Sequence, residues 1–437
     1  LSPKLNVQNF KLGEVNSEQG GLTVGQAQAL VSWRSVLTLS PKFVDIQIQQ
    51  AQLAITRDKQ GSYWLAGQKI EPDGTEGNPA LDWLLRQSDL GLSASSLLWT
   101  DYLAAGDQAQ PQTLQVDVKA TVQNRLNSHV IQLAAESPSV LVEPLSLSLA
   151  FNTPLWLIDR DKTQHWQGKA HASIKASNLK PLTQQIKAWL KTENYTLSAE
   201  GLDTELWADF ADGEIRDGLM TFALAKLQLD DPTVAAKSFN MSNVSSTFNL
   251  KGFKPQKLDG ELSVIGFQTD LPGGEHLGPV DARFSRESGD AHNGALMRLK
   301  FANLDAGRVK NIASVLLPHL RQQKVNELFQ SFDVAGKLDS MDLSWQMPAH
   351  LKSVNLEFKD LSVHTQKGGF TGLNGSLSGN SAEGVWALNG TELQIAMPEL
   401  FEQGNKSLSQ LDGQGYWKNI FTAANEVDVA TGGANST

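Results

Sequence analysis

The chain has 437 residues, of which 40% are hydrophobic, with a net charge of −10 and no cysteine. The acidic balance argues against nucleic acid, whose phosphates repel an acidic surface, and against a polybasic grip on anionic lipid headgroups. The absence of cysteine excludes disulfides, zinc-thiolate sites and thiol catalysis.

The predicted elements, taken in chain order, are mostly strands. Apolar and polar residues alternate with a period of two, which is typical of strands with one buried face and one solvated face. Sheets of this kind are antiparallel as a rule. The clearest alternating segments are residues 44–48, 114–122, 145–151, 343–347, 354–358 and 393–397.

Turn signals separate these segments. Asp-Gly and Asn-Gly pairs supply the positive backbone φ that a two-residue hairpin turn requires. Their density predicts long meanders of hairpins and argues against βαβ crossovers. The pairs begin at Asp73, Asp212, Asp217, Asp259, Asn293, Asn374, Asn389 and Asp412.

Three segments instead show helical spacing of apolar residues. They are residues 79–87, with Leu81, Leu84 and Leu85 on one face, residues 181–191, and residues 309–332, which Pro318 interrupts. The sequence therefore predicts a mainly β fold with a few short helices. The expected regions are a first β-groove region at 1–178, a second at 179–301 that a short helix opens, a helix pair at 302–333, a third β region at 334–422 and a tail at 423–437.

The ends of the chain carry no targeting signal. No stretch reaches the roughly 20 apolar residues of a transmembrane helix, and no signal peptide opens the sequence. Because Leu1 lies in a strand-like region, we interpret the chain as part of a longer protein. The tail, rich in Ala, Gly, Asn, Ser and Thr, is interpreted as disordered or as a repeat cut short.

Motifs for catalysis and metal binding are missing from the sequence. The eight histidines are scattered, and there is no P-loop, no G-x-S-x-G elbow and no G-x-G-x-x-G after a strand. The four acidic residues between positions 209 and 217 lack the spacing of an EF-hand loop and suit hairpin turns. Arg57 and Asp58 are interpreted as a solvated turn. We therefore expect no enzymatic activity, no metal and no cofactor.

The eleven tryptophans allow two interpretations. Exposed tryptophan platforms are typical of sugar-binding β-proteins. Most of these tryptophans, however, stand beside other apolar residues, as Trp99 does after Leu97 and Leu98. This spacing favours packing in a core or a groove.

Several short words of the sequence, taken in order, resemble one protein family. They include Val31-Ser-Trp33-Arg-Ser-Val-Leu37, Arg57-Asp58-x-x-Gly61, Trp83-Leu-Leu-Arg-Gln87, Leu206-Trp207-Ala-Asp209-Phe210 and Met397-Pro398-Glu-Leu-Phe401. Their order over about residues 1–420 resembles that of the AsmA-like YhdP proteins of Gram-negative bacteria, although no single word is specific.

This resemblance implies a fold and a function. Proteins of this kind are tethered to the inner membrane and extend through the periplasm, with strands curled into open half-barrels that stack into an elongated repeating β-groove. They are linked to phospholipid transport toward the outer membrane and to envelope integrity. The resemblance implies phospholipids as ligands, the inner membrane as a partner through an anchor absent from this chain, and envelope proteins as partners at the chain ends.

Apolar positions of three alternating segments are candidates for lining such a groove. In the alternative interpretation they are ordinary core residues covered by helices. Two other functions stay open: an elongated periplasmic structural or interaction scaffold without a lipid conduit, which predicts closed sheets, and a carbohydrate-binding β-protein, which predicts solvent-facing tryptophans beside paired carboxylates. The candidates are Leu114, Val116, Val118, Leu145, Leu147, Leu149, Val354, Leu356 and Phe358.

Overall fold

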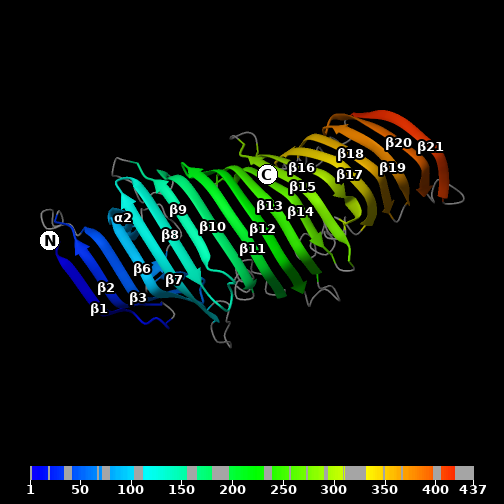
Figure 1. Cartoon of the computed structure of the whole chain (residues 1–437). Coiled ribbons are helices and arrows are strands. Elements are labelled where there is room, and N and C mark those ends of the chain that lie inside the picture. The colour runs from blue at the N-terminus through cyan, green and yellow to red at the C-terminus, as the bar shows by residue number, and fades with distance from the viewer. Residues whose placement is uncertain are drawn as a thin grey trace, which may run out of the picture. The chain divides into compact units, whose positions relative to one another are not determined.

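The computed structural model describes residues 2–17, 20–33, 42–65, 68–70, 79–102, 112–154, 165–179, 196–230, 239–254, 257–271, 274–289, 294–308, 310, 331–347, 350–365, 368–396 and 405–418. Within these residues it contains the strands β1 to β21 and the helix α2 (Figure 1). The protein divides into two compact units. The N-terminal unit comprises Leu1–Pro255 and Asp270–Gly274, and the C-terminal unit comprises Gln256–Thr269 and Glu275–Thr437.

The described strands of the N-terminal unit form one sheet. Ladders of hydrogen bonds join β1, β2, β3, β6 and then β7 to β13 in this order, and the β4–β5 hairpin adds to the edge of β3 beyond β2. The elements are β1 (Lys4–Leu12), β2 (Leu22–Val31), β3 (Phe43–Arg57), β4 (Tyr63–Leu65), β5 (Gln68–Ile70), α2 (Pro79–Arg86), β6 (Asp89–Asp101), β7 (Gln112–Arg125), β8 (Ser128–Glu136), β9 (Leu145–Asn152), β10 (Gln167–Asn178), β11 (Thr196–Ala211), β12 (Glu214–Asp230) and β13 (Phe239–Lys254).

One pair of strands contradicts the prediction that the chain has no βαβ crossover. β3 and β6 run parallel, in a register from Asp45↔Asp89 to Arg57↔Asp101. The helix α2, which the spacing of apolar residues at 79–87 correctly predicts, lies between them in the chain. A parallel pair needs such a connection, because a tight turn can only join antiparallel strands. The helix and the crossover are thus one feature.

The C-terminal unit continues as a meander. Antiparallel ladders join β15 to β21 in chain order. Neither unit shows a ladder that closes on its first strand within the described residues, so the predicted mainly β fold with an open, curled sheet is confirmed. The strands are β14 (Asp259–Asp270), β15 (His276–Glu287), β16 (Leu296–Asp305), β17 (Phe332–Gln346), β18 (His350–Thr365), β19 (Gly368–Gly379), β20 (Glu383–Ala396) and β21 (Asn405–Lys418).

The other predicted helices and regions are not tested by these residues. The segment 181–191 lies outside the described residues, as does 309–332 except for 310, 331 and 332. The tail at 423–437 lies outside them as well. The region boundaries expected near 178–195 and 302–333 therefore stay predictions.

The Asx-Gly pairs divide into turns and strand interiors. Asp212–Gly213 forms the predicted tight turn between β11 and β12, with φ of 55° and 73°. The pairs at Asp217, Asn374, Asn389 and Asp412 lie inside strands, so the turn prediction is wrong there. The pair Asp73–Gly74 lies outside the described residues, as does Asn293 of the pair Asn293–Gly294. Asp259 and Gly260 are the first two residues of β14.

Glycines in the last strands make room for indole rings. A Cβ at Gly415 would overlap the ring of Trp386, and a Cβ at Gly384 would overlap the ring of Trp417. Each glycine lies directly opposite its tryptophan in the ladder of β20 and β21. Aromatic side chains that cover cross-strand glycines stabilise glycine-rich sheet positions, which explains why several glycines belong to strands here and not to turns.

Most strands contain one residue in the left-handed region, and we call this set the crease. Its φ angles run from 47° at Ala94 to 110° at Gly336. Such bulge-like residues bend a strand and increase its local twist, which curls a sheet. The crease comprises Asn9, Gln50, Ala94, Gly201 and Asn243 in the N-terminal unit, and Gly266, Asn303, Gly336, Asp360, Gly372 and Glu392 in the C-terminal unit.

The crease also changes the phase of the apolar alternation. Before Ala94, the even-numbered residues Leu90 and Leu92 of β6 lie opposite the even-numbered residues Val122 and Ala120 of β7. After Ala94, odd-numbered residues of β6, such as Leu97, lie opposite the even-numbered residues of β7. β7 itself has no crease residue, so all its even-numbered side chains share a face. The one-residue slip therefore keeps Leu90, Leu92, Leu97 and Trp99 on a single face, while Leu98 points to the other.

Asp58 closes the turn between β3 and β4. Its Oδ1 accepts hydrogen bonds from the backbone N–H groups of Gln60 (2.9 Å) and Ser62 (2.8 Å), and its Oδ2 accepts one from Trp64 Nε1 (2.8 Å). Burial raises the pKa of this carboxyl, but these three hydrogen bonds and the charge of Lys69 outweigh burial, so the pKa lies below its ordinary value.

We expect this turn to lose stability in acid. A carboxyl whose pKa is lower in the folded state stabilises that state above its unfolded pKa of about 3.9, and the contribution is lost as the pH falls through the folded value. Asp58→Asn should therefore flatten the acid branch of the unfolding free energy, measured by urea denaturation between about pH 2 and 5. Trp64→Phe, which removes one of the three hydrogen bonds, should give an intermediate slope. Equal slopes in all three proteins would contradict the assignment.

Candidate functional site

All six candidates of the N-terminal unit lie on one face of its sheet. The β7 candidates share a face because no crease residue interrupts their alternation. The register carries this face across β8 to β9, since Val118 lies opposite Ala135 and Ala135 lies opposite Leu145. The six candidates are Leu114, Val116, Val118, Leu145, Leu147 and Leu149.

This face extends over the whole sheet of the unit. Directly paired residues of neighbouring strands point to the same side. From β1 to β13 one line of paired residues is apolar at every strand, and we call it the central apolar row. Its eleven members are Val7, Ala27, Ile48, Leu92, Ala120, Leu133, Leu147, Ala172, Leu206, Met220 and Phe248.

The next line of paired residues points to the opposite face and is mostly polar. The two faces therefore differ in chemistry along the full width of the unit. Its members are Asn6, Gln28, Gln47, Gly91, Thr121, Gln132, Ser148, His171, Trp207, Leu219 and Asn249.

The central apolar row is open to its surroundings. None of its eleven side chains is buried, and Leu147 and Leu206 are 37% and 38% exposed. Along β7, however, the apolar side chains are half-buried and the polar ones between them are exposed. A flat single layer would expose both faces alike, so the difference along β7 fits an apolar face on the inner side of the curl.

A second apolar line crosses the C-terminal unit and includes the candidate Leu356. Leu356 lies opposite Met341 on β17 and Leu377 on β19. Phe358, two residues on, is 7% exposed and packs with Leu373 and Leu393 in a buried cluster. The third candidate, Val354, lies opposite Leu343 and Gly379. Of the three, Phe358 has the environment of a core residue.

The helix α2 covers one end of the apolar face in the N-terminal unit. Leu85, 1% exposed, packs with Phe151 and Trp166, and the partly buried Ile131 and Leu149 pack against this cluster. The ring of Phe151 stacks on that of Trp166 with 4.0 Å between centroids. Leu149 is therefore partly covered, whereas Leu147 on the same strand is not.

A buried polar network fixes the end of α2 to the sheet. Asn124 Nδ2 donates to the carbonyl oxygen of Leu84 (2.9 Å), in the last turn of α2, and to that of Gln87 (2.6 Å), just beyond the helix. Because this amide nitrogen is the donor, Asn124 Oδ1 accepts from His129 Nδ1 (2.7 Å), and His129 Nε2 lies 3.0 Å from Thr153 Oγ1, at hydrogen-bond distance. His129 is fully buried.

Sequence reasoning did not identify this network. The histidines are scattered along the sequence, and their spacing names no partner for His129. Asn124 and His129 flank the short turn between β7 and β8 and lie opposite each other in the ladder. A polar pair at the end of an otherwise apolar alternation is the only signal that the sequence offers.

A buried ion pair lies at the other end of β3 and β6. Arg57 donates from Nη2 to Asp101 Oδ2 (2.5 Å) and from Nε to Asp101 Oδ1 (3.1 Å), and the two side chains are 5% and 1% exposed. They lie two residues beyond Ile55 and Trp99, on the apolar face. Asp58 is 8% exposed. The interpretation of Arg57 and Asp58 as a solvated turn is therefore correct for the turn and wrong for solvation.

The acidic residues between 209 and 217 do not form a cluster. Asp209 pairs with Lys169 (3.5 Å), Asp212 with Arg216 (2.9 Å), and Glu214 with a lysine of β13 (3.6 Å). No group of three or more carboxylate or imidazole side chains within the described residues could hold a metal ion. Three of the four acids therefore form separate surface ion pairs.

The described tryptophans fall into three groups, of which the half-buried one comprises Trp64, Trp99, Trp345 and Trp386. Trp166 and Trp417 are each 8% exposed and belong to packed regions, as the core or groove interpretation predicts. Trp33, Trp83 and Trp207 are 56%, 42% and 39% exposed, so the interpretation does not extend to all of them.

The fold and this face define the class: an open, curled β-sheet whose apolar side is largely uncovered in the part of the chain that the structure describes. The family model described as YhdP protein matches residues 1–432, and the chain belongs to this family. The resemblance seen in the sequence is thus confirmed. The family is one of the cell envelope. Comparisons with curated proteins and with solved structures give no match.

Membrane-spanning helices were sought as well. Among the described residues, no helix combines the length and the apolarity needed to cross a membrane.

Proposed function

We propose that the central apolar row holds the acyl chains of phospholipids, and that the protein passes phospholipid between the inner and outer membranes through the periplasm. The observation that carries the proposal is the row itself, with eleven strands in register, an apolar residue at each, and none of these side chains buried. An apolar surface that folding leaves uncovered on the inner side of a curl fits an apolar ligand.

The dimensions suit a chain of successive lipid positions. Neighbouring strands lie about 4.8 Å apart, so eleven strands span about 50 Å. One leaflet's share of a hydrocarbon core is about 15 Å, so the row exceeds the length of a single acyl chain about threefold. The proposed groove therefore offers several overlapping positions.

The energetics allow movement along the row. Two acyl chains removed from water gain on the order of 20 kcal/mol, at about 0.8 kcal/mol for each methylene group. A membrane offers the same gain, so transfer between the two is close to neutral. Because the members of the row differ little in polarity, successive positions have similar energies. The headgroup would stay in water at the open side of the curl.

Membership in a cell-envelope family supports the proposed location, and the proposed partners are those that the resemblance in the sequence implies. The chain would lie in the periplasm as part of a protein tethered to the inner membrane, with envelope proteins at its ends. The proposed activity moves a lipid without making or breaking a covalent bond, so it needs no catalytic group and no cofactor.

Lipid contact at Leu147 tests the proposal. We expect a photo-crosslinking amino acid at position 147 to capture phospholipid when the protein is made in bacteria, and the same group at Ser148, which points to the opposite face, to capture none. Leu147→Asp should reduce phospholipid that co-purifies in detergent-free buffer by about tenfold, because about 1.4 kcal/mol of carboxylate desolvation suffices for that factor. Ser148→Asp is the matched control and should change nothing.

Leu147 is 37% exposed, so its replacement should leave the fold intact, which circular dichroism would verify. Equal crosslinking at 147 and 148, or a folded protein without lipid at either position, would contradict the proposal. The second result would favour a structural or interaction scaffold.

A further inference from the structure

A cavity of about 460 Å³ lies within the C-terminal unit, where β15, β16 and β17 approach the same end of the sheet. All three strands bend here, with φ of 110° at Gly278, 55° at Asn303 and 110° at Gly336. The bends separate neighbouring strands and leave room between them. The residues that line the cavity and carry the argument are Leu277, Val280, Asp305, Arg308 and Lys337.

One wall of the cavity is apolar. Leu277 and Val280 are 4% and 8% exposed, and Pro279 lies between them in the lining. The volume falls within the roughly 300–1,000 Å³ of small-molecule sites, which are mostly apolar with a few placed polar groups.

The other side of the cavity carries a fixed guanidinium. Asp305 Oδ1 accepts the backbone N–H of Arg308 (2.9 Å), and Asp305 Oδ2 lies 3.4 Å from Arg308 Nε. Arg308 Nη1 also donates to the carbonyl oxygen of His276. The guanidinium is thus held between the start of β15 and the end of β16 and does not need to be ordered by a ligand.

Lys337 adds a second positive charge to the lining of the cavity. Lys337 lies opposite Asp305 in the ladder, but it makes no ion pair within the described residues. Two neighbouring lysines differ from it, because Lys310 pairs with Asp333 (2.6 Å) and Lys359 with Asp339 (2.6 Å). The lining therefore holds two cations and one carboxylate, in a chain whose net charge is −10.

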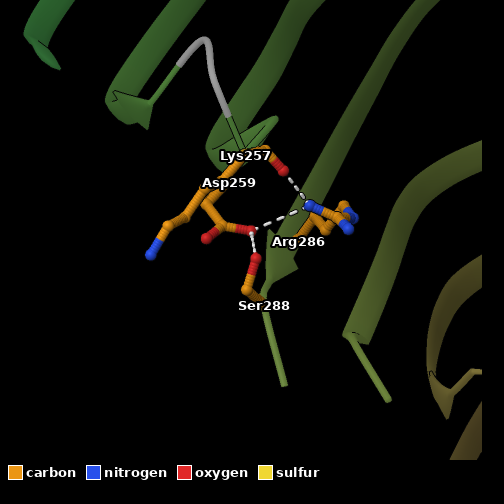
Figure 2. Close-up of polar contacts among 4 residues, drawn as sticks. All are labelled: Lys257, Asp259, Arg286 and Ser288. Atoms are coloured by element: carbon orange, nitrogen blue, oxygen red, sulfur yellow. Dashed lines mark hydrogen bonds and ion pairs between the residues drawn. The ribbon is translucent and has the colours of Figure 1, made fainter. Parts of the chain in front are cut away.

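Figure 2 shows a contrasting arginine of the same unit. Arg286 Nη1 donates to Asp259 Oδ1 (2.9 Å) and to the carbonyl oxygen of Lys257, and Ser288 donates to the same carboxylate oxygen (2.8 Å). This arginine fastens the turn before β14 to the end of β15, and its charge is matched by Asp259. The lining around Arg308 differs because it has one cation in excess.

We propose that this cavity binds the phosphate group of a phospholipid, with Lys337 and Arg308 as the cationic partners and the Leu277–Val280 wall against the carbon atoms next to the phosphate. The inference rests on the proposed function and adds to it a headgroup site apart from the apolar row. Charged donors suit a phosphate, and a free phosphate ion would leave the apolar wall without a partner.

Binding of a soluble lipid to the whole chain tests the site. The probe is dihexanoylphosphatidylglycerol below its micelle concentration, titrated by calorimetry. Lys337→Gln should weaken binding by about tenfold, the effect of losing one charge-assisted contact to phosphate. Lys300→Gln is the matched control, because it removes an equal charge from an exposed lysine of β16 that pairs with Asp342 (2.6 Å). Inorganic phosphate at the lipid's concentration should not compete.

Four results would overturn the inference. Equal weakening by Lys337→Gln and Lys300→Gln would show unspecific attraction. Displacement of the lipid by inorganic phosphate would show a site for the free ion. If Lys337→Gln binds the lipid as tightly as the wild type and crosslinking at position 147 is preserved, the headgroup site is refuted and the proposed function is not. A wild-type chain that binds phospholipid in neither assay would remove both.

Discussion

Asp101→Asn is expected to lower the free energy of unfolding by about 3–5 kcal/mol, the cost of breaking a buried ion pair by removing one partner. Both side chains of the Arg57–Asp101 pair are at most 5% exposed, and two contacts, of 2.5 Å and 3.1 Å, join them. Asparagine keeps the shape but not the charge, so the guanidinium would stay buried without its carboxylate. Urea denaturation followed by tryptophan fluorescence measures the loss.

The double variant Arg57→Met with Asp101→Leu separates charge from packing. Replacement of a buried pair by apolar residues of similar volume is often neutral or stabilising. We therefore expect the double variant to recover most of the stability that Asp101→Asn loses. A loss below about 1 kcal/mol in the single variant would match a solvent-exposed pair and contradict the buried geometry.

The position of this pair explains why it matters for the apolar face. Arg57↔Asp101 is the last register pair of the parallel ladder between β3 and β6. Beyond it β3 enters the Asp58 turn, and at this end the β4–β5 hairpin takes the place of β2 beside β3. The pair thus holds together the strands at which the meander is interrupted, while the apolar row continues past them through Ile48 and Leu92.

The sequence predicts the strands and the chemistry of their faces well, because a period of two is a local property. The six N-terminal candidates lie on one face for this reason. Pairing between distant segments is not local, so the parallel β3–β6 pair and the Arg57–Asp101 contact, 44 residues apart, leave no mark in the alternation. The role of the glycines opposite Trp386 and Trp417 cannot be predicted from the sequence for the same reason, since it depends on the neighbouring strand.

The positions of the crease residues, unlike the pairing of distant strands, leave a pattern in the sequence. In β3, Ile46 and Ile48 alternate at even positions, and Leu53 and Ile55 at odd positions, with Gln50 at φ 54° between them. Two alternating runs whose phase differs by one residue resemble two separate strands, or a single strand with an irregular pattern. Read as a single strand with a left-handed residue, they predict both the bend and the continuity of the apolar face.

Gly201→Val is expected to lower the free energy of unfolding by about 2–6 kcal/mol, from backbone strain and from overpacking. Gly201 is the crease residue of β11, with φ at +69°, and a Cβ there would lie 2.6 Å from the Cβ of Ala225 on β12. A β-branched side chain therefore meets an unfavourable backbone conformation and a steric clash together. Thermal and urea unfolding of the purified variant measure the loss.

Two further variants separate these causes and connect the crease to the proposed function. Gly266→Val, at φ +63° with no atom within 4 Å of its added Cβ, should show only the strain and lose about 1–3 kcal/mol. Ala225→Gly should partly rescue Gly201→Val by removing the clash. If the crease sets the curl that keeps the apolar face inside, the folded Gly201→Val protein should also lose phospholipid crosslinking at position 147. A Gly201→Val protein of full stability and unchanged crosslinking would show that the crease is not needed for either.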